Sequence, residues 1–175
     1  MPRLEPVTEL DVRQVPFGDP LVQGLVAELQ AEFVVRYGGP DHTPLETTMF
    51  DPPSGAFLLG VAGSEPVAIG GWRRRPDVTA LGGAVAAEIK RMYVVPGARG
   101  RGYSRLLLSR LEESAAEAGA DVMVLETGIK QPEAISLYES AGYVPIPGFG
   151  FWKDSPTSRC FAKPLAPGLP VSRAG

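Results

Sequence analysis

The stretch that decides the fold is Glu88–Ser104, which reads EIKRMYVVPGARGRGYS. Its first half is rich in apolar, β-branched and aromatic residues, a composition that favours a strand ending near Val95. Pro96 and the glycine after it stop this strand, because proline cannot donate to a ladder and glycine permits a sharp turn. Gly100 and Gly102 follow, and a helical pattern begins directly after them. We therefore predict a strand, a glycine-rich turn and a helix in immediate succession.

This turn is a candidate anion site. The free N–H groups of a first helical turn point at whatever occupies the loop before it, and the helix dipole favours negative charge there. Between Ile89 and Leu111 six residues are basic and none is acidic, although the whole chain has 17 Lys plus Arg against 20 Asp plus Glu. We interpret the turn as the site of a phosphorylated ligand, the alternative being a tight turn with a solvated basic rim.

Two familiar phosphate-binding loops do not fit the sequence. A P-loop needs glycine, four residues and then Gly-Lys-Ser/Thr, and the chain has no such run. The dinucleotide fingerprint needs a third glycine three positions after Gly102, where the chain has Arg105.

The segment resembles motif A of the GCN5-related N-acetyltransferases, the GNAT family. That motif reads Arg/Gln-x-x-Gly-x-Gly/Ala between a strand and a helix, and here it is Arg99-Gly100-Arg101-Gly102-Tyr103-Ser104, with serine where glycine or alanine is usual. A second family element follows, from Leu125-Glu126-Thr127 to Gly142-Tyr143, with Gln131 where the family often has asparagine. The two elements together span about a third of the chain, from Glu88 to Tyr143.

The resemblance implies an α/β fold with a mixed, mostly antiparallel central sheet, a splayed parallel strand pair and flanking helices. The β-α-β unit from Glu88 to Thr127 independently predicts a parallel pair with a right-handed crossover. Elsewhere, hydrophobic periodicity and turn residues predict strands at 10–15, 56–62, 66–73, 143–146 and 159–165, and helices at 20–37, 103–118 and from 132 onward. We expect 41–54 to be loop-rich and the arginines at 73–75 to be a solvated strand end, with anion binding as the alternative.

Bulk properties predict one domain, over residues 5–167, and a flexible tail over 168–175. No apolar run approaches the roughly 20 residues of a membrane span, and the N-terminus has no apolar signal core. A single cysteine cannot form an intrachain disulfide, so we expect a cytoplasmic protein without a membrane partner. The net charge of −3 argues against a nucleic-acid partner, and one His and one Cys far apart predict no metal site.

Coenzyme A (CoA) recognition is assigned by the resemblance. It implies acetyl-CoA as co-substrate, with the pyrophosphate at the glycine turn and the pantetheine amides on the backbone of the preceding strand. The expected cofactor-binding residues are Met92, Tyr93, Val94, Arg99, Gly100, Arg101, Gly102, Tyr103, Ser104 and Gln131.

Two residues are candidates for the proton transfers of acetyl transfer. Glu88, at the start of the apolar strand, is the candidate base that deprotonates the amine; a surface glutamate at a strand end is an equally weighted alternative. Tyr138 matches a tyrosine that lies near the coenzyme sulfur in the family and is the candidate acid, its alternative being a core aromatic. We expect the only histidine, His42, to be a solvated loop side chain.

The sequence therefore predicts an N-acetyltransferase that moves an acetyl group from acetyl-CoA to a primary amine in a ternary complex. The acceptor is a small molecule or peptide that the sequence does not identify, and the oligomeric state stays open, a homodimer included. Three alternatives remain: an acyltransferase for longer acyl-CoA, a non-catalytic acyl-CoA sensor, and a nucleic-acid module built on the Arg-Gly turn.

Overall fold

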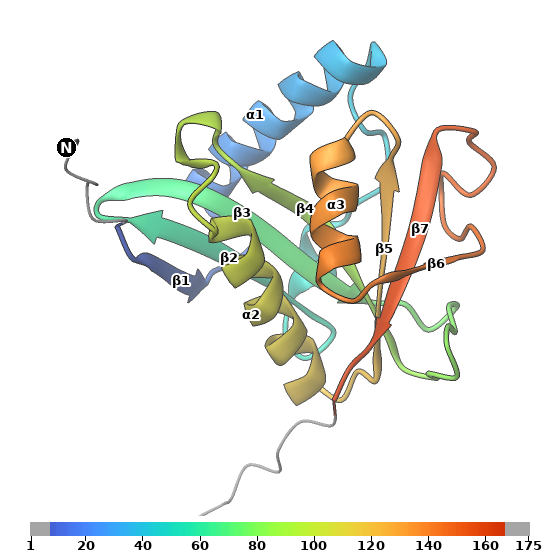
Figure 1. Ribbon diagram of the computed structural model, residues 1–175. Coiled ribbons are helices and arrows are strands. Elements are labelled where there is room, and N and C mark those ends of the chain that lie inside the picture. Colours follow the sequence, from blue (N-terminus) through green and yellow to red (C-terminus); the bar gives the residue numbers. More distant parts are fainter. Residues whose placement is uncertain (1–7, 167–175) are drawn as a thin grey trace, which may run out of the picture.

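A computed structural model describes residues 8–166, so the boundary at residue 5 and the tail at 168–175 lie outside the described residues. Its centre is a seven-stranded sheet with the order β1-β2-β3-β4-β5-β7-β6 (Figure 1). The strands are β1 (Leu10–Gln14), β2 (Gly55–Ala62), β3 (Glu65–Arg74), β4 (Ala86–Val94), β5 (Val122–Gly128), β6 (Val144–Ile146) and β7 (Ser158–Pro164). The helices are α1 (Pro20–Tyr37), α2 (Tyr103–Glu117) and α3 (Pro132–Ser140), with short 3₁₀ turns η1 (Thr47–Phe50) and η2 (Pro96–Ala98).

The parallel strand pair is where the sequence predicted it. All neighbouring strands run antiparallel except β4 and β5, which α2 connects. The parallel register covers only Ala86–Glu88 against Val122–Val124. Beyond these residues the two strands diverge, and α3 lies in front of the widening gap in Figure 1. The predicted mixed sheet with a splayed parallel pair is confirmed.

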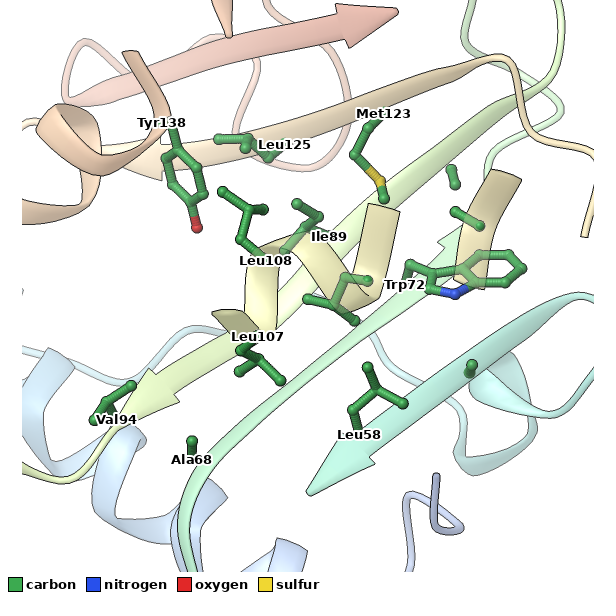
Figure 2. Packing of buried hydrophobic residues seen from close by; sticks show 14 of the residues in the cluster. Leu58, Ala68, Trp72, Ile89, Val94, Leu107, Leu108, Met123, Leu125 and Tyr138 are labelled. Atoms are coloured by element: carbon green, nitrogen blue, oxygen red, sulfur yellow. The ribbon is translucent and has the colours of Figure 1, made fainter. Parts of the chain in front are cut away.

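Each face of the sheet carries its own hydrophobic cluster. On one face α2 and α3 pack over a core centred on Trp72, Leu107 and Leu108 (Figure 2). The Trp72 indole also donates to the Ser114 hydroxyl of α2 at 2.9 Å, which satisfies its buried N–H. On the other face α1 and η1 cover a second cluster that includes Phe57. The sheet is thus fixed from both sides, and only the diverging ends of β4 and β5 stay open between the layers.

The 41–54 segment is loop-rich as predicted, with the short turn η1 inside it. One local expectation needs correction. The arginines at 73–75 are not a solvated strand end: the side chains of Arg73 and Arg75 are each 12% exposed and bind the carboxylate of Glu88. Two guanidinium groups are removed from water because a buried carboxylate on the neighbouring strand offers them a partner.

Candidate active site

The diverging ends of β4 and β5 enclose a cavity of about 480 Å³. Its floor is formed by β4 and β5, and its walls by the C-terminal half of α1, the loop after α1, the start of α3 and the loop between β6 and β7. The lining is apolar and aromatic on the α1 and α3 sides and carries charged groups between the strands. This combination of an apolar wall with a few polar groups is typical of a small-molecule site.

The glycine turn has the backbone geometry of an anion site. Gly100 and Gly102 have φ angles of 77° and 82°, a left-handed conformation that glycine adopts without strain. A Cβ atom at either position would meet nothing within 4 Å among the described atoms, so the space above the turn is open. Gly102 is the N-cap of α2, and no described side chain caps that helix. The first N–H groups of α2 are therefore available to a ligand.

The basic residues around this turn do not gather into one cluster. Arg99 donates to the Val94 carbonyl and to the Glu32 carboxylate, both at 2.9 Å, which ties the turn to α1. Arg105 donates to the Ser140 hydroxyl at 2.8 Å, which links α2 to α3. Arg101 is exposed and lines a separate groove near the start of α1. The sequence predicted a local concentration of positive charge, but much of that charge is already engaged or points elsewhere.

None of the residues 99–104 lines the cavity itself. The connection between turn and cavity is α3, whose Ser140 contacts Arg105 and whose Tyr138 lines the cavity. Gln131, the N-cap of α3, also lines the cavity, and its amide donates to the Tyr37 hydroxyl at 3.4 Å. An extended ligand anchored at the turn would therefore run along α3 to reach the space between the strands.

In the predicted cofactor-binding stretch, Met92–Val94, one side chain lines the cavity and two are buried in the core. The side chains of Tyr93 and Val94 are buried in opposite hydrophobic clusters, and the ring of Tyr103 is also in the core. Met92 alone of these lines the cavity. The β3–β4 register shifts next to it, at Arg91, which has a φ of 55°. Such a bulge re-aims backbone groups, and it occurs where β4 has lost β5 as its partner.

Tyr138 belongs both to the hydrophobic core and to the cavity lining. Its ring is 7% exposed and lies beside Leu108 and Leu125 in the core (Figure 2). Its hydroxyl lies at the cavity wall and contacts the sulfur of Met92 at 3.7 Å. Burial raises the pKa of the Tyr138 phenol, so the hydroxyl keeps its proton and acts as a donor.

Glu88 is neither an exposed glutamate nor part of the cavity wall. Its side chain is 3% exposed, which excludes the surface alternative. Its Oε1 accepts from Arg73 at 2.8 Å and from Arg75 at 2.9 Å, and Oε2 lies 4.0 Å from the Lys90 ammonium. Both guanidinium groups bind the same oxygen, so Oε1 is occupied as an acceptor, while no described residue donates a hydrogen bond to Oε2.

Glu126 lines the cavity, as Asp41 also does, and it is not among the site residues predicted from the sequence. It lies on β5, is partly buried and accepts from the Ser158 hydroxyl at 2.8 Å. Burial raises its pKa above the ordinary value, with Ser158 and Lys90 acting in the opposite direction. The residue stands in the LET stretch of the second family element, but its place in the cavity is seen only in the folded chain, because the parallel register ends at Val124.

The far end of the cavity is held together by Asp41, directly after α1. Its carboxylate binds Arg91 of β4, the Thr43 hydroxyl at 2.5 Å and the Trp152 indole at 3.0 Å. Three segments far apart in sequence therefore meet at one buried anion. The Arg91 guanidinium keeps the pKa of Asp41 well below its usual range, since the charge attraction and the hydrogen bonds outweigh the cost of burial. His42 is exposed, as expected, but it also lines the cavity.

Among the described residues, no helix is long and apolar enough to cross a membrane. Within residues 8–166, no three His, Cys, Asp or Glu side chains are grouped so that they could hold a metal ion.

Comparisons with known proteins agree with this geometry. The chain is 33% identical over 160 residues to the IAA acetyltransferase of Azospirillum brasilense, covering 87% of this chain and 95% of that protein. It is 32% identical over 99 residues to the mycothiol acetyltransferase of Beutenbergia cavernae, covering 57% of this chain and 31% of the relative.

An acyl-CoA N-acyltransferase structure from Klebsiella pneumoniae superimposes with a TM-score of 0.72 at 26% identity, covering 90% of this chain and 98% of that one. The model of the acetyltransferase (GNAT) family matches residues 22–143. That match includes the glycine turn, the splayed strand pair and α3, and the chain belongs to the acetyltransferase (GNAT) family.

Proposed function

We propose that this protein transfers an acetyl group from acetyl-CoA to a primary amine by direct attack in a ternary complex. One observation carries the proposal most directly. A single cavity brings together a carboxylate with a raised pKa, Glu126, and a buried phenol that keeps its proton, Tyr138. Acetyl transfer needs one group that accepts a proton from the amine and one that donates a proton to the departing sulfur.

The ligand path follows from the arrangement of α2 and α3. The open glycine turn and the uncapped start of α2 receive the pyrophosphate through backbone N–H groups. The pantetheine arm runs past Gln131 and joins the backbone of Met92, Tyr93 and Val94, where β4 has no partner from β5. The thioester then lies beside the Tyr138 hydroxyl, and a backbone N–H at the bulge polarises its carbonyl.

We assign the base to Glu126 in place of Glu88. Glu126 faces the cavity, whereas Glu88 is the last residue of β4 that pairs with β5 and is held by two arginines. The ammonium of the acceptor gives one proton to Glu126, and the free amine then attacks the carbonyl carbon. As the C–N bond forms and the C–S bond breaks, Tyr138 gives its proton to the sulfur. The second proton of the nitrogen restores the phenol through solvent.

An acceptor screen tests the function. Purified protein is mixed with acetyl-CoA and a panel of amines, and release of the free CoA thiol is measured. We expect release only with particular amines and stoichiometric formation of the acetylamide. A non-catalytic sensor predicts CoA binding without release on any amine, and a longer acyl donor predicts faster release from propionyl- or butyryl-CoA. We place this reaction in the cytoplasm, where acetyl-CoA is available.

A further inference from the structure

Lys90 is a buried cation in the cavity that lacks a close partner. It is 8% exposed, and its Nζ lines the same space as Glu126. The nearest carboxylate oxygen among the described residues is Glu88 Oε2, at 4.0 Å, too far for a hydrogen bond. An ammonium has three donors, and a buried charged group with unfilled donors is costly. A group of this kind is expected to have a partner when the site is occupied.

Lys90 and Glu126 line the cavity from different strands. The parallel register ends where Glu88 of β4 pairs with Val124 of β5, and each of the two charged residues stands two positions further along its own strand, on the same face as the paired residue. The two strands diverge beyond the paired residues, so Lys90 and Glu126 belong to opposite sides of the same cavity.

The other charged groups nearby are paired with opposite charges or stacked on a ring. Asp41 is bound by Arg91, and Glu88 is bound by Arg73 and Arg75. The Nε of Arg91 has no hydrogen-bond partner among the described residues, but its guanidinium charge is paired with Asp41. Lys130 lies at the cavity rim, where its ammonium stacks 5.6 Å from the centre of the half-buried Tyr37 ring. Within the described lining, Lys90 has its nearest carboxylate at 4.0 Å and Glu126 is bound by a hydroxyl, so these two groups, from opposite walls, are left to receive a ligand.

We propose that the acceptor is an amino carboxylate, such as a free amino acid, whose carboxylate binds Lys90 while its amine faces Glu126. This inference rests on the proposed function and names its substrate class. A single ammonium matches the single charge of a carboxylate better than a phosphate dianion. The pair of opposite charges across the cavity matches a zwitterion. Leu29, Phe33 and Ile89 provide apolar wall for the remainder of the molecule.

The test compares matched acceptors that differ only in the carboxylate. Each amino acid is paired with its primary amide and with the amine that lacks the carboxyl carbon, and kcat/KM is measured by thiol release. Because the three amines differ in basicity, the decisive quantity is the carboxylate-to-amide ratio in the wild type divided by the same ratio in a Lys90→Met variant. A charge-assisted contact predicts that this quotient is about 10 to 100, because the carboxylate-to-amide ratio falls by that factor in Lys90→Met.

Lys130→Met is the matched control, because it removes the other lysine of the cavity. We expect it to leave the ratio unchanged. Lys90→Met leaves Glu88 with both arginines, so the fold should survive, and Lys90→Gln serves if the methionine variant does not fold. Equal ratios in the wild type and Lys90→Met overturn the proposal. Loss of selectivity in Lys130→Met alone also overturns it. So does a panel in which amines without a carboxylate are acetylated and amino acids are not.

A binding measurement separates this proposal from the proposed function. The same amino acids are titrated with CoA present, and the shift in thermal unfolding is followed. If no amine releases thiol but the amino acids stabilise the wild type and not Lys90→Met, the transfer reaction is wrong and the site assignment holds. If amines without a carboxylate are acetylated and amino acids neither bind nor react, the reaction holds and the carboxylate site is wrong.

Discussion

The paired and the open stretches of β4 and β5 each carry a glutamate, and the two glutamates have opposite environments. In the paired stretch, Glu88 is 3% exposed and is bound by two arginines from β3 and the loop after it. In the open stretch, Glu126 faces a cavity, accepts one hydroxyl hydrogen bond and has a pKa raised by burial. Both carboxylates lie on the same face of the sheet, a single strand apart.

This difference supports the assignment of the base to Glu126 and not to Glu88. Both guanidinium partners of Glu88 bind its Oε1, and Glu88 does not line the cavity in which an acceptor would bind. A carboxylate with a hydroxyl partner keeps the desolvation cost, so it accepts a proton more readily at neutral pH. The strand divergence after Glu88 decides which environment each glutamate receives.

The sharpest test of the comparison exchanges the two carboxylates for amides. Glu126→Gln should lower kcat by about 100- to 10,000-fold, the usual contribution of a general base. Glu88→Gln should lower kcat by less than about tenfold in protein that is folded. We would measure kcat for each variant with a validated acceptor, and the dissociation constant of CoA for the same variants. The opposite order of effects would return the base assignment to Glu88.

Stability should show the reverse order. Glu88→Gln leaves Arg73 buried without a countercharge and Arg75 with Asp77 alone, and breaking a buried ion pair typically costs about 3–5 kcal/mol. Denaturant unfolding without ligand would measure this loss. Asp77→Asn is the matched control, because Asp77 binds the same Arg75 but its side chain is 65% exposed, and exposed pairs contribute about 1 kcal/mol or less. A loss no larger than that of the control would mean that the Glu88 cluster does not hold β3 to β4.

The contrast between Glu88 and Glu126 was not readable from the sequence. The strand, glycine turn, helix and second family element were local patterns, and they predicted the fold, the parallel pair and the family correctly. The partners of Glu88 come from Arg73 and Arg75, whose contact depends on antiparallel register between β3 and β4. A pattern of three consecutive arginines looks the same whether it faces water or a buried carboxylate.

The cavity lining was hidden for a similar reason. Lys90 and Arg91 belong to the basic run that predicted an anion site at the turn, yet both lie at the cavity. A bulge at Arg91 changes the alternation of side chains along β4, so faces counted from the sequence are wrong beyond that point. Asp41 and Trp152 meet across 111 positions of sequence, a contact that only the folded chain defines.

The acid side of the cavity should be less critical than the base side. Tyr138→Phe keeps the ring packed against the core and removes only the hydroxyl. We expect kcat to fall by about 100-fold, the lower end for a general acid, because a thiol of pKa near 8.5 leaves readily without full protonation. The CoA dissociation constant should barely move. A modest stability change with normal kcat would show that the core role of Tyr138 is its only one.

The glycine turn extends the comparison to ligand binding. Gly102→Val would place a branched side chain in the open space above the turn and in an unfavourable φ of 82°. We expect the CoA dissociation constant to rise by at least about tenfold, since the backbone N–H groups can no longer approach the pyrophosphate. Gly82→Val controls for strain, because Gly82 has a φ of 80° and equally open surroundings away from the cavity. Equal CoA affinity in calorimetry for both variants and the wild type would remove the turn from the binding site.

The smallest expected effect is on the acidic limb of the pH–kcat profile, which distinguishes the two glutamates without a change in the fold. Burial raises the pKa of Glu126 above its ordinary value of 4.5, so its reactive carboxylate is lost by protonation as the pH falls through that raised pKa. At saturating acceptor, kcat should therefore decline on the acidic side by up to about tenfold per pH unit, and the decline should begin above pH 4.5. Asp41 does not produce this limb, because its pKa is held well below its usual range. Glu126→Gln should flatten the limb and Glu88→Gln should leave it in place, since only the first residue meets the acceptor. If the acidic limb persists in Glu126→Gln, a group other than Glu126 accepts the proton of the amine. The open stretch of β4 and β5 would then differ from the paired stretch in shape but would not supply the base.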